Sequence, residues 1–325
     1  MSVDPLRRWA QYGEKPDFAG LLTFGGVPYV QDPAGLEGVD VAIVGAPTDE
    51  LVSDRPGTRF APRAIRAAGC PPGPHLEAKV DALAELRVVD YGDAPVTPAD
   101  PERSHAAIRS TVGEVLAAGA IPFVLGGDHS ISEPDITACA EKHGPVGLVH
   151  FDTHTDTGTE VFGVAGLSHG TIMRRLVEAG HVAADRYVQI GLRGYWPGET
   201  EFAWQRERGI TSLFMHDVRD LGIRDVIARV INVAGVGPVF LSVDIDVLDP
   251  AFIPGGTGTP EPGGMTSSDL LWAVREVAAR LEVIGADLVE VIPTAIGSAD
   301  NAALVADRVV REVLTGIALR RRAAV

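Results

Sequence analysis

Three short segments of this sequence place histidines and aspartates at spacings that suit metal binding. They are GGDHS at 126–130, HFDTHTD at 150–156 and SVDID at 242–246, and their candidate ligands are His129, Asp152, His154, Asp156, Asp244 and Asp246. Alternate residues of an extended backbone point to the same side, so the D-x-H-x-D and D-x-D patterns each present one ligand face. A single histidine or one D-x-D pair would more often be a cap or a turn. Together they favour a shared site, because the apolar surroundings would penalise unpaired buried charges.

The chemistry of these side chains indicates which ions they would hold. Four carboxylates packed together repel one another and raise each other's pKa unless cations offset them. The set contains no thiolate, which favours manganese, with nickel as an alternative, over a structural zinc site. Four anionic and two neutral ligands suit two divalent ions with at least one aspartate between them. The sequence therefore predicts a cofactor of two divalent metal ions.

The elements that must position these residues recur along the chain as short β-branched runs. The runs begin at Val39, Leu86, Ile121, Val146, Arg186, Thr211, Val239 and Val283. Several are apolar without alternation, which is typical of strands covered on both faces in a parallel sheet with crossover helices. Ligands bind such sheets outside the carboxyl ends of the strands, so the three segments can converge there. We expect an α/β fold with a parallel sheet of about eight strands.

Segments with helical spacing lie between the runs. They include 108–116, 270–281 and a last helix from about Ala299 to Arg320, and Thr266 with Asp269 resembles a capping box before the second. Strand and helix alternate without a break in composition, so we expect one domain over 1–325, with 1–38 as an N-terminal extension packing on it. Two loops, 152–168 and 249–266, are long for such a fold, and long loops often carry function.

Charge and cysteine content restrict the partners and the compartment. The 325 residues carry a formal net charge of −16, whose field would repel nucleic acid or an anionic membrane and attract a small cation. Cys70 and Cys139 are too few for a disulfide framework, and we expect both to be reduced structural residues. No apolar run has the length of a signal-peptide core or a membrane span, so the cytoplasm is the expected compartment.

Further segments extend the pattern of the metal-binding blocks. They are RPGTRFAPRAIR from Arg55, SHGT at 168–171 and SVDIDVLDPAFIPGGTGTPEPGG from Ser242. With GGDHS and HFDTHTD, they resemble the signature blocks of the arginase and agmatinase superfamily from about Val39 to the end of the chain. The resemblance implies a three-layer α/β/α domain, a binuclear manganese cluster and assembly into trimers or hexamers. It also implies that Asp152 and Asp244 bridge the ions, that His129 and Asp156 complete one shell, and that His154 and Asp246 complete the other.

The same resemblance implies a hydrolase that adds water to a guanidinium carbon and releases urea. Metals lower the pKa of bound water, so a hydroxide is available near neutral pH. Asp156 is expected to pass a proton to the departing amine, and His169 resembles the family's proton shuttle at the cavity mouth. Glu290 matches the carboxylate that holds the guanidinium through a bidentate pairing. Without that role, His169 would be a histidine that merely begins a helix near the site, and Glu290 a buried strand residue paired with an internal arginine.

The substrate prediction rests on positions that differ from arginases. Arginases have Asn at the position of Gly158, and Asp, Val, Asp where this chain has Gly194, Tyr195 and Trp196. An amino-acid head group would be left without polar partners, so we expect no arginase activity. Negative charge from Glu50, Asp54 and Glu160 near the expected mouth favours the amine tail of agmatine, which would give putrescine and urea.

Other substrates and other functions remain open at this point. The alternatives are guanidinobutyrate or another guanidino acid, free guanidine, and a guanidino natural product. A metal-binding subunit without activity would be expected to lack one of the metal ligands or His169. This chain has all six candidate ligands and His169. A hydrolase of formimino or amide groups would be expected to change Glu290, and Glu290 is present.

Overall fold

A computed structural model of the chain describes residues 19–69, 73–294 and 300–324. Its centre is an eight-stranded sheet in the order β2-β1-β3-β10-β9-β4-β7-β8, in which every pairing is parallel. The strands are β1 (Val41–Ala46), β2 (Val88–Asp93), β3 (Ile121–Gly126), β4 (Val146–Phe151), β7 (Val182–Leu192), β8 (Thr211–Phe214), β9 (Pro238–Asp244) and β10 (Glu282–Val289). The predicted parallel sheet of about eight strands is confirmed.

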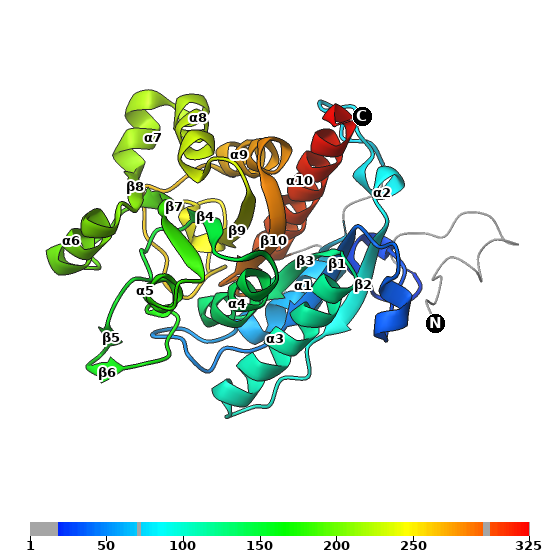
Figure 1. The fold of residues 1–325 in the computed structure, drawn as a ribbon, viewed down its shortest axis with the longest axis horizontal. Helices are drawn as coiled ribbons and strands as arrows, with labels where there is room; N and C mark the ends of the chain where they lie inside the picture. Colours follow the sequence, from blue (N-terminus) through cyan, green and yellow to red (C-terminus); the bar gives the residue numbers. More distant parts are fainter. Residues whose placement is uncertain (1–18, 70–72, 295–299, 325) are drawn as a thin grey trace, which may run out of the picture.

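Helices cover both faces of this sheet. The longer ones are α1 (Ala61–Ala68), α3 (Pro101–Ala117), α4 (Ser132–His143), α6 (Glu199–Arg208), α8 (Ile223–Ala234), α9 (Ser267–Arg280) and α10 (Asn301–Ala323), and the shorter ones are α2 (Ala82–Glu85), α5 (Ile172–Glu178) and α7 (Met215–Leu221). One apolar cluster joins the sheet to α1, α8, α9 and α10, and a second joins it to α3, α4 and α5. Figure 1 shows α8, α9 and α10 on one side of the strands and α3, α4 and α5 on the other, so the three-layer architecture is confirmed.

The predicted helices form where their sequence signals lie. Thr266 caps α9 by accepting the Asp269 N–H at 3.1 Å, and Asp300 caps α10 by accepting the Ala303 N–H at 2.8 Å. α10 packs along α9 because Gly316 has no side chain. A Cβ at Gly316 would lie 2.5 Å from the carbonyl oxygen of Arg275. The expected start of this helix at Ala299 lies outside the described residues.

One element departs from the expected long loop 152–168. A two-stranded hairpin forms there from β5 (Glu160–Val161) and β6 (Val164–Ala165). Its two-residue turn has positive φ at both positions, 51° at Phe162 and 75° at Gly163. Two-residue hairpin turns with positive φ at both positions match the twist of their strands, but their usual sequence signal is Asn-Gly or Asp-Gly. A phenylalanine in the first position hides this hairpin from sequence analysis.

Part of the expected N-terminal extension packs on the sheet. Phe24 is fully buried, and its N–H donates to Asp90 Oδ2 at 2.8 Å at the edge strand β2. Residues 1–18 and Cys70 lie outside the described residues, and the single-domain organisation stays a prediction. Cys139 is buried in α4 and free. Within the described ranges, no helix has both the length and the apolar character needed to cross a membrane.

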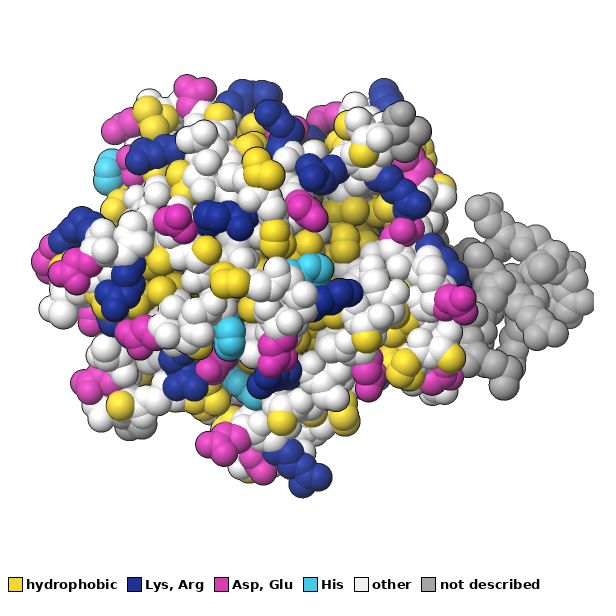
Figure 2. Space-filling view, viewed as in Figure 1, with side chains coloured by type: hydrophobic (Ala, Val, Ile, Leu, Met, Phe, Trp, Pro, Cys, Tyr) yellow, Lys and Arg dark blue, Asp and Glu magenta, His cyan; other side chains and the backbone are white. Residues whose placement is uncertain are grey.

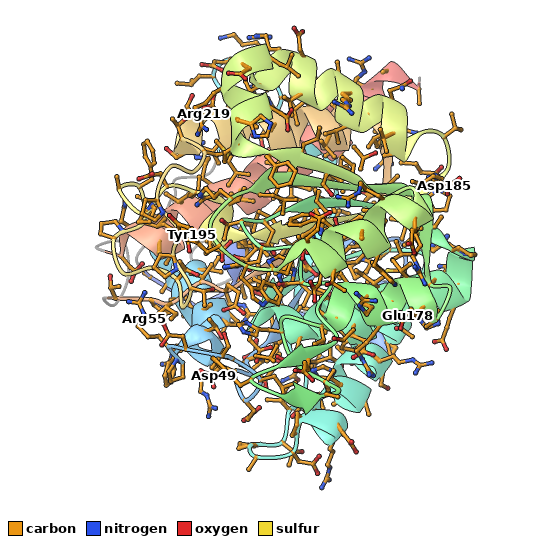
Figure 3. All side chains as sticks on the ribbon, turned by 90° about the vertical axis from the view of Figure 1, so that its left-hand side faces the viewer. Asp49, Arg55, Glu178, Asp185, Tyr195 and Arg219 are labelled. Carbon is orange, nitrogen blue, oxygen red and sulfur yellow. The ribbon has the colours of Figure 1, made fainter. Side chains whose placement is uncertain are left out.

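The four central strands end beside the predicted site residues. His129 follows β3, Asp152 follows β4, Asp244 ends β9, and Glu290 follows β10. These strands are neighbours in the order β3-β10-β9-β4, and their parallel direction brings all four ends to one edge of the sheet. Figure 3 shows that edge on its left side, where Asp49, Arg55 and Tyr195 follow strand ends, whereas Asp185 lies at the opposite edge.

Candidate metal centre

His129 lies at the centre of a group of carboxylates. Its Nδ1 is 3.2 Å from Asp152 Oδ2, 2.9 Å from Asp156 Oδ2 and 3.2 Å from Asp244 Oδ2. The other ring nitrogen, Nε2, is 3.0 Å from Ser242 Oγ. If Nε2 carries the ring proton and donates it to Ser242, Nδ1 presents a lone pair to the three carboxylates. This arrangement is what a histidine ligand requires, since metals bind the unprotonated nitrogen.

A second group shares Asp152 with the first. His154 Nδ1 is 3.0 Å from Asp246 Oδ2 and 3.7 Å from Asp152 Oδ1. The His154 side chain is 19% exposed, whereas Asp152 and Asp246 are fully buried. All six predicted ligands therefore lie together at the edge of the sheet, in two groups joined by Asp152. Their role as metal ligands stays a prediction.

The electrostatics of the cluster favour bound cations. Burial, followed by the charges of Asp246 and Asp152, raises the pKa of Asp244 well above its ordinary value. Burial would lower the pKa of His154, but Asp246 and Asp152 outweigh it and raise that pKa to about 10. His129 Nδ1 is buried and makes no geometrically sound hydrogen bond within the described part of the chain. Oxygen and imidazole donors without a thiolate fit borderline divalent ions, so the residues present fit the expected metals.

His150 lies behind the cluster and was not among the residues predicted from the sequence. His150 Nε2 is 2.8 Å from Asp152 Oδ2, and His150 Nδ1 is 3.0 Å from the hydroxyl of Tyr187. His129, His150 and Asp152 also form a group whose donor atoms are close enough to hold an ion. Because both His150 nitrogens have protein partners, we assign it to orienting Asp152. The alternation of His150 with Asp152 and His154 was a signal that could have revealed it.

Glu290 and His169 lie together beside the cluster. Glu290 Oε1 accepts from the backbone N–H of His129 at 2.9 Å and is 2.9 Å from His169 Nδ1. The partner of the buried Glu290 is therefore a histidine rather than an internal arginine. Oε2 has no hydrogen-bond partner among the described residues, and the Cβ position of Gly258 lies 3.8 Å from it.

Ser53 completes the surroundings of His169. Its hydroxyl is 2.8 Å from His169 Nε2, and its backbone N–H is 3.0 Å from the same nitrogen. When His169 Nε2 carries no proton, it can accept a hydrogen bond from the Ser53 N–H. When Nε2 is protonated, it can donate to the Ser53 hydroxyl. Burial would lower the pKa of His169, but the hydrogen bond and charge of Glu290 raise it to about 9. Ser53 comes from the loop after β1, 116 positions from His169, so sequence spacing gave no signal for it.

Two site residues have unusual backbone conformations. Asp156 has φ of 51° and Glu290 has φ of 61°, which lie in the left-handed region that side chains other than glycine rarely adopt. Strained backbones of this kind cluster at functional sites, where the surrounding structure maintains them.

Comparison with known proteins identifies the family. The model of the Arginase family matches residues 39–316. The chain belongs to the arginase family. This arginase-family chain is 41% identical over 281 residues to guanidinobutyrase from Pseudomonas aeruginosa, covering 86% of the chain and 87% of the relative. It is 41% identical over 260 residues to the mitochondrial agmatinase of Gallus gallus, covering 79% of the chain and 75% of the relative.

A solved structure supports the same assignment. The arginase-family chain matches proclavaminate amidino hydrolase from Streptomyces clavuligerus with a TM-score of 0.87 and 33% identity, covering 94% of this chain and 100% of that one. The fold expected from the sequence resemblance is therefore the fold of a solved relative.

At the expected mouth of the arginase-family site, Glu50 has a positively charged neighbour that the sequence did not predict. Glu50 accepts from the hydroxyl of Thr48, and its Oε1 lies 3.3 Å from Arg59 Nη2. Arg59 also pairs with the buried Asp49. Asp49 and Glu50 share the single charge of Arg59, so the charge of Glu50 is only partly offset. Arg55 is exposed nearby, and its Nε donates to the carbonyl of Gly258 at 3.3 Å. No carboxylate within the described ranges pairs with Arg55.

Arg193 holds the glycine-rich loop 249–266 against the site. Its guanidinium donates to the backbone carbonyls of Asp246 at 2.9 Å, Leu248 at 3.1 Å and Val247 at 3.1 Å. It also reaches the Glu261 carbonyl at 2.6 Å. One side chain thereby satisfies carbonyls that a loop without regular structure leaves unpaired.

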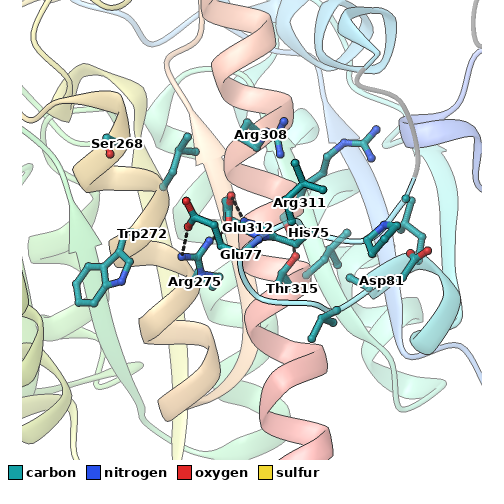
Figure 4. A pocket seen from close by; sticks show the side chains of 18 of the residues that line it. His75, Glu77, Asp81, Ser268, Trp272, Arg275, Arg308, Arg311, Glu312 and Thr315 are labelled. Carbon is teal, nitrogen blue, oxygen red and sulfur yellow. Dashed lines mark hydrogen bonds and ion pairs between the residues drawn. The ribbon is translucent and has the colours of Figure 1, made fainter.

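A separate groove of the arginase-family chain lies away from the predicted metal ligands. It has a volume of about 1070 Å³ between the segment 73–83 and the helices α8, α9 and α10. Figure 2 shows acidic and basic side chains interspersed over the face of the molecule that it presents. Figure 4 shows a network at the base of the groove, in which Arg275 Nη1 donates to Glu312 Oε2 at 2.7 Å. His75 Nε2 is 3.0 Å from Glu312 Oε1. None of the six predicted ligands lines this groove.

Proposed function

We propose that this arginase-family protein is a metal-dependent hydrolase that adds water to a guanidino group and releases urea and an amine. One observation carries the proposal: Glu290 Oε2, which has no hydrogen-bond partner among the described residues, belongs to a carboxylate that lies beside the predicted metal-binding cluster. Glu290 Oε1 accepts the N–H of His129 at 2.9 Å, which fixes the carboxylate against the cluster. The names of the relatives, guanidinobutyrase and agmatinase, support a guanidino substrate.

We assign the two divalent ions, with manganese first and nickel second, to the six predicted ligands. The distances support one ion with His129 and Asp156, a second with His154 and Asp246, and Asp152 shared between them. Asp244, 3.2 Å from His129 Nδ1, is the second proposed bridge. When bound, such ions supply Lewis acidity and make a water molecule acidic enough to react near neutral pH.

The protein's own groups would perform the remaining steps. Glu290 Oε2 accepts hydrogen bonds from the guanidinium N–H groups and positions the guanidinium carbon beside the cluster. Asp156 takes a proton as water adds to that carbon and returns it to the departing nitrogen as the C–N bond breaks. His169, held by Glu290 at Nδ1 and by Ser53 at Nε2, would carry protons between the site and solvent at the mouth. The products are urea and the amine of the substrate tail.

Agmatine, cleaved to putrescine and urea, is the first proposed substrate. Asp54 is exposed and follows Ser53, which bonds His169. Glu160 is exposed, and its carbonyl lies 3.4 Å from the Cβ position of Gly158. With the net charge of −16, these carboxylates favour a cationic tail.

A guanidino acid such as 4-guanidinobutyrate is the second candidate. Arg55 is exposed, lies near Glu290 through its bond to Gly258, and has no carboxylate partner in the described part of the chain. A guanidinium in this position could pair with a carboxylate tail. Free guanidine and guanidino natural products fit the same reaction.

We also propose a cytoplasmic homo-oligomer, a trimer or hexamer, on the basis of the family resemblance. Light scattering on the purified protein would measure its mass. A monomeric mass at micromolar concentration would contradict this assignment and leave the proposed reaction in place.

A parallel assay tests the reaction and separates the substrates. After loading with Mn²⁺ or Ni²⁺, urea release is measured from agmatine, 4-guanidinobutyrate, guanidine and arginine, with bound metal determined in the same sample. We expect urea from agmatine or the guanidino acid and none from arginine. Glu290→Gln should weaken turnover while the bound metal is unchanged. The proposal is overturned if metal-loaded protein releases no urea from any guanidino compound.

A further inference from the structure

Trp196 lies against the site from the loop that follows β7. Its ring centroid is 6.1 Å from that of His154, with an angle of 66° between the planes. Its Cη2 is 3.3 Å from the Cβ position of Gly170, the residue after His169. The indole therefore borders a predicted metal ligand on one side and the backbone beside the predicted proton shuttle on the other. It is 41% exposed, so part of the side chain is accessible to solvent.

Two glycines provide the surface on which this indole rests. A Cβ at Gly158 would lie 3.1 Å from Trp196 Cζ2 and 3.0 Å from the carbonyl oxygen of Gly170. Contacts this short are tight, so a Cβ at either glycine would require the indole or another neighbour to shift by a few tenths of an ångström. The close packing of Trp196 beside His154 therefore depends in part on the absence of side chains at Gly158 and Gly170.

The volume that the indole fills has a consequence for the substrate. The indole borders His154 and Gly170, so a guanidino compound held by Glu290 whose tail leaves the cluster on this side passes the ring. An unbranched chain of methylenes can lie along an indole face. A branched carbon with two charged groups would meet the ring, and the indole carbons offer those groups no hydrogen bonds.

We propose that Trp196 is a specificity-determining residue, an aromatic wall that admits unbranched guanidino compounds and excludes those with a substituted α-carbon. This inference rests on the proposed hydrolysis of guanidino compounds. To that function it adds steric selection of the substrate tail by one side chain, Trp196, and the two glycines that it packs against.

Three substrates test the filter because they differ by one group each. Agmatine is arginine without its carboxylate, and 5-guanidinopentanoate is arginine without its amino group. Trp196→Ala should raise kcat/KM for arginine relative to both unbranched compounds by about tenfold or more, the scale that steric exclusion from a pocket provides. Because wild-type protein is expected to release no measurable urea from arginine, the wild-type ratio is bounded by the detection limit, and the change should appear as measurable urea release from arginine by Trp196→Ala. Trp196→Phe should restore most of the discrimination.

Tyr195 provides a matched control. It precedes Trp196, is also aromatic and is 100% exposed, and Figure 3 shows it at the edge of the molecule. Tyr195→Ala should leave the substrate ratios unchanged. Gly158→Ala should lower kcat/KM for agmatine in the wild-type background and less in Trp196→Ala, because the contact with the indole is then removed while the contact with the Gly170 carbonyl remains.

The outcomes distinguish this inference from the proposed function. Unchanged substrate ratios in both Trp196→Ala and Trp196→Leu, with urea still released from the unbranched compounds, would overturn the inference alone. An equal effect of Gly158→Ala in both backgrounds would also overturn it. No urea from any of the three compounds with wild-type, metal-loaded protein would overturn the proposed function and the inference with it.

Discussion

At the scale of single residues, the predicted metal site contains more negative charge than the protein alone can stabilise. Asp244 is buried against Asp246 and Asp152, and its hydrogen bond from the Asp246 N–H at 2.8 Å involves only Oδ1. An asparagine could keep that bond with its amide oxygen and remove one charge. The same substitution should therefore act in opposite directions on the metal-free and metal-loaded protein.

We expect Asp244→Asn to raise the melting temperature of the metal-free protein, because repulsion within the cluster falls. It should lower metal affinity by at least about 100-fold, beyond the effect of removing a residue that only orients a ligand. Calorimetry with and without Mn²⁺ and measurement of bound metal check both. A fall in melting temperature without metal would show that repulsion is not the dominant effect.

The His169–Glu290 pair predicts a dependence on pH. The pKa of His169 is raised to about 9 by Glu290, so the protonated ring is present below that pH and is lost as pH rises through it. Proton donation by His169 should decline above about pH 9. In Glu290→Gln the loss of the negative partner should move this decline to lower pH. The pH profile of kcat for both proteins, with metal content held constant, provides the measurement. An unshifted basic limb would exclude His169 as its origin.

Residue spacing predicted the six candidate ligands, the resemblance to the arginase and agmatinase superfamily predicted Glu290 and His169, and the structure brings these residues together. Neither source predicted Ser53 or the orienting role of His150. A ligand in a D-x-H-x-D pattern has a local signature, since neighbours along an extended chain share a face. Ser53 reaches His169 only because the loop after β1 folds over the end of the sheet. Contacts of this kind depend on packing and carry no sequence period.

At the scale of elements, the eight strands follow from continuous apolar runs, and the capped helices follow from their cap residues. The hairpin β5–β6 does not, since Phe162 occupies a turn position where asparagine or glycine would be expected. The order of strands in the sheet is likewise beyond the sequence pattern, because each run could pair with several others. Pairing is decided by which helices fit between the sheet and solvent.

The contact of α9 with α10 gives a prediction for stability. Gly316→Ala would place a Cβ 2.5 Å from the Arg275 carbonyl and 2.6 Å from the Ala278 Cβ. We expect a loss of about 1–3 kcal/mol in the free energy of unfolding, as for other overpacked contacts. Gly113→Ala in α3 is the matched control, since nothing lies within 4 Å of its Cβ position. It should be neutral or stabilising by up to about 1 kcal/mol. Urea denaturation measures both, and equal effects would contradict the close packing.

At the scale of the whole molecule, the net charge of −16 should influence substrate binding. Salt screens the attraction between a negative protein and a cationic substrate over distances of about 10 Å at 0.1 M. KM for agmatine should therefore rise as salt is increased, whereas KM for 4-guanidinobutyrate, which has no net charge at neutral pH, should change little. Steady-state assays across a salt series compare the two. A parallel rise for both would show that salt acts on the protein rather than on attraction to its field.

The place of β10 in the sheet bears on how this chain is made. β10 (Glu282–Val289) is the last strand to be synthesised, yet it lies between β3 and β9, the strands that lead to His129 and Asp244. A growing chain on the ribosome therefore cannot join the two halves of its catalytic pocket until almost all of it has emerged. Until then both flanking strands have an open edge towards the gap, which is a hazard for aggregation. Newly made chains should depend on chaperones for longer than a fold whose central strands come first.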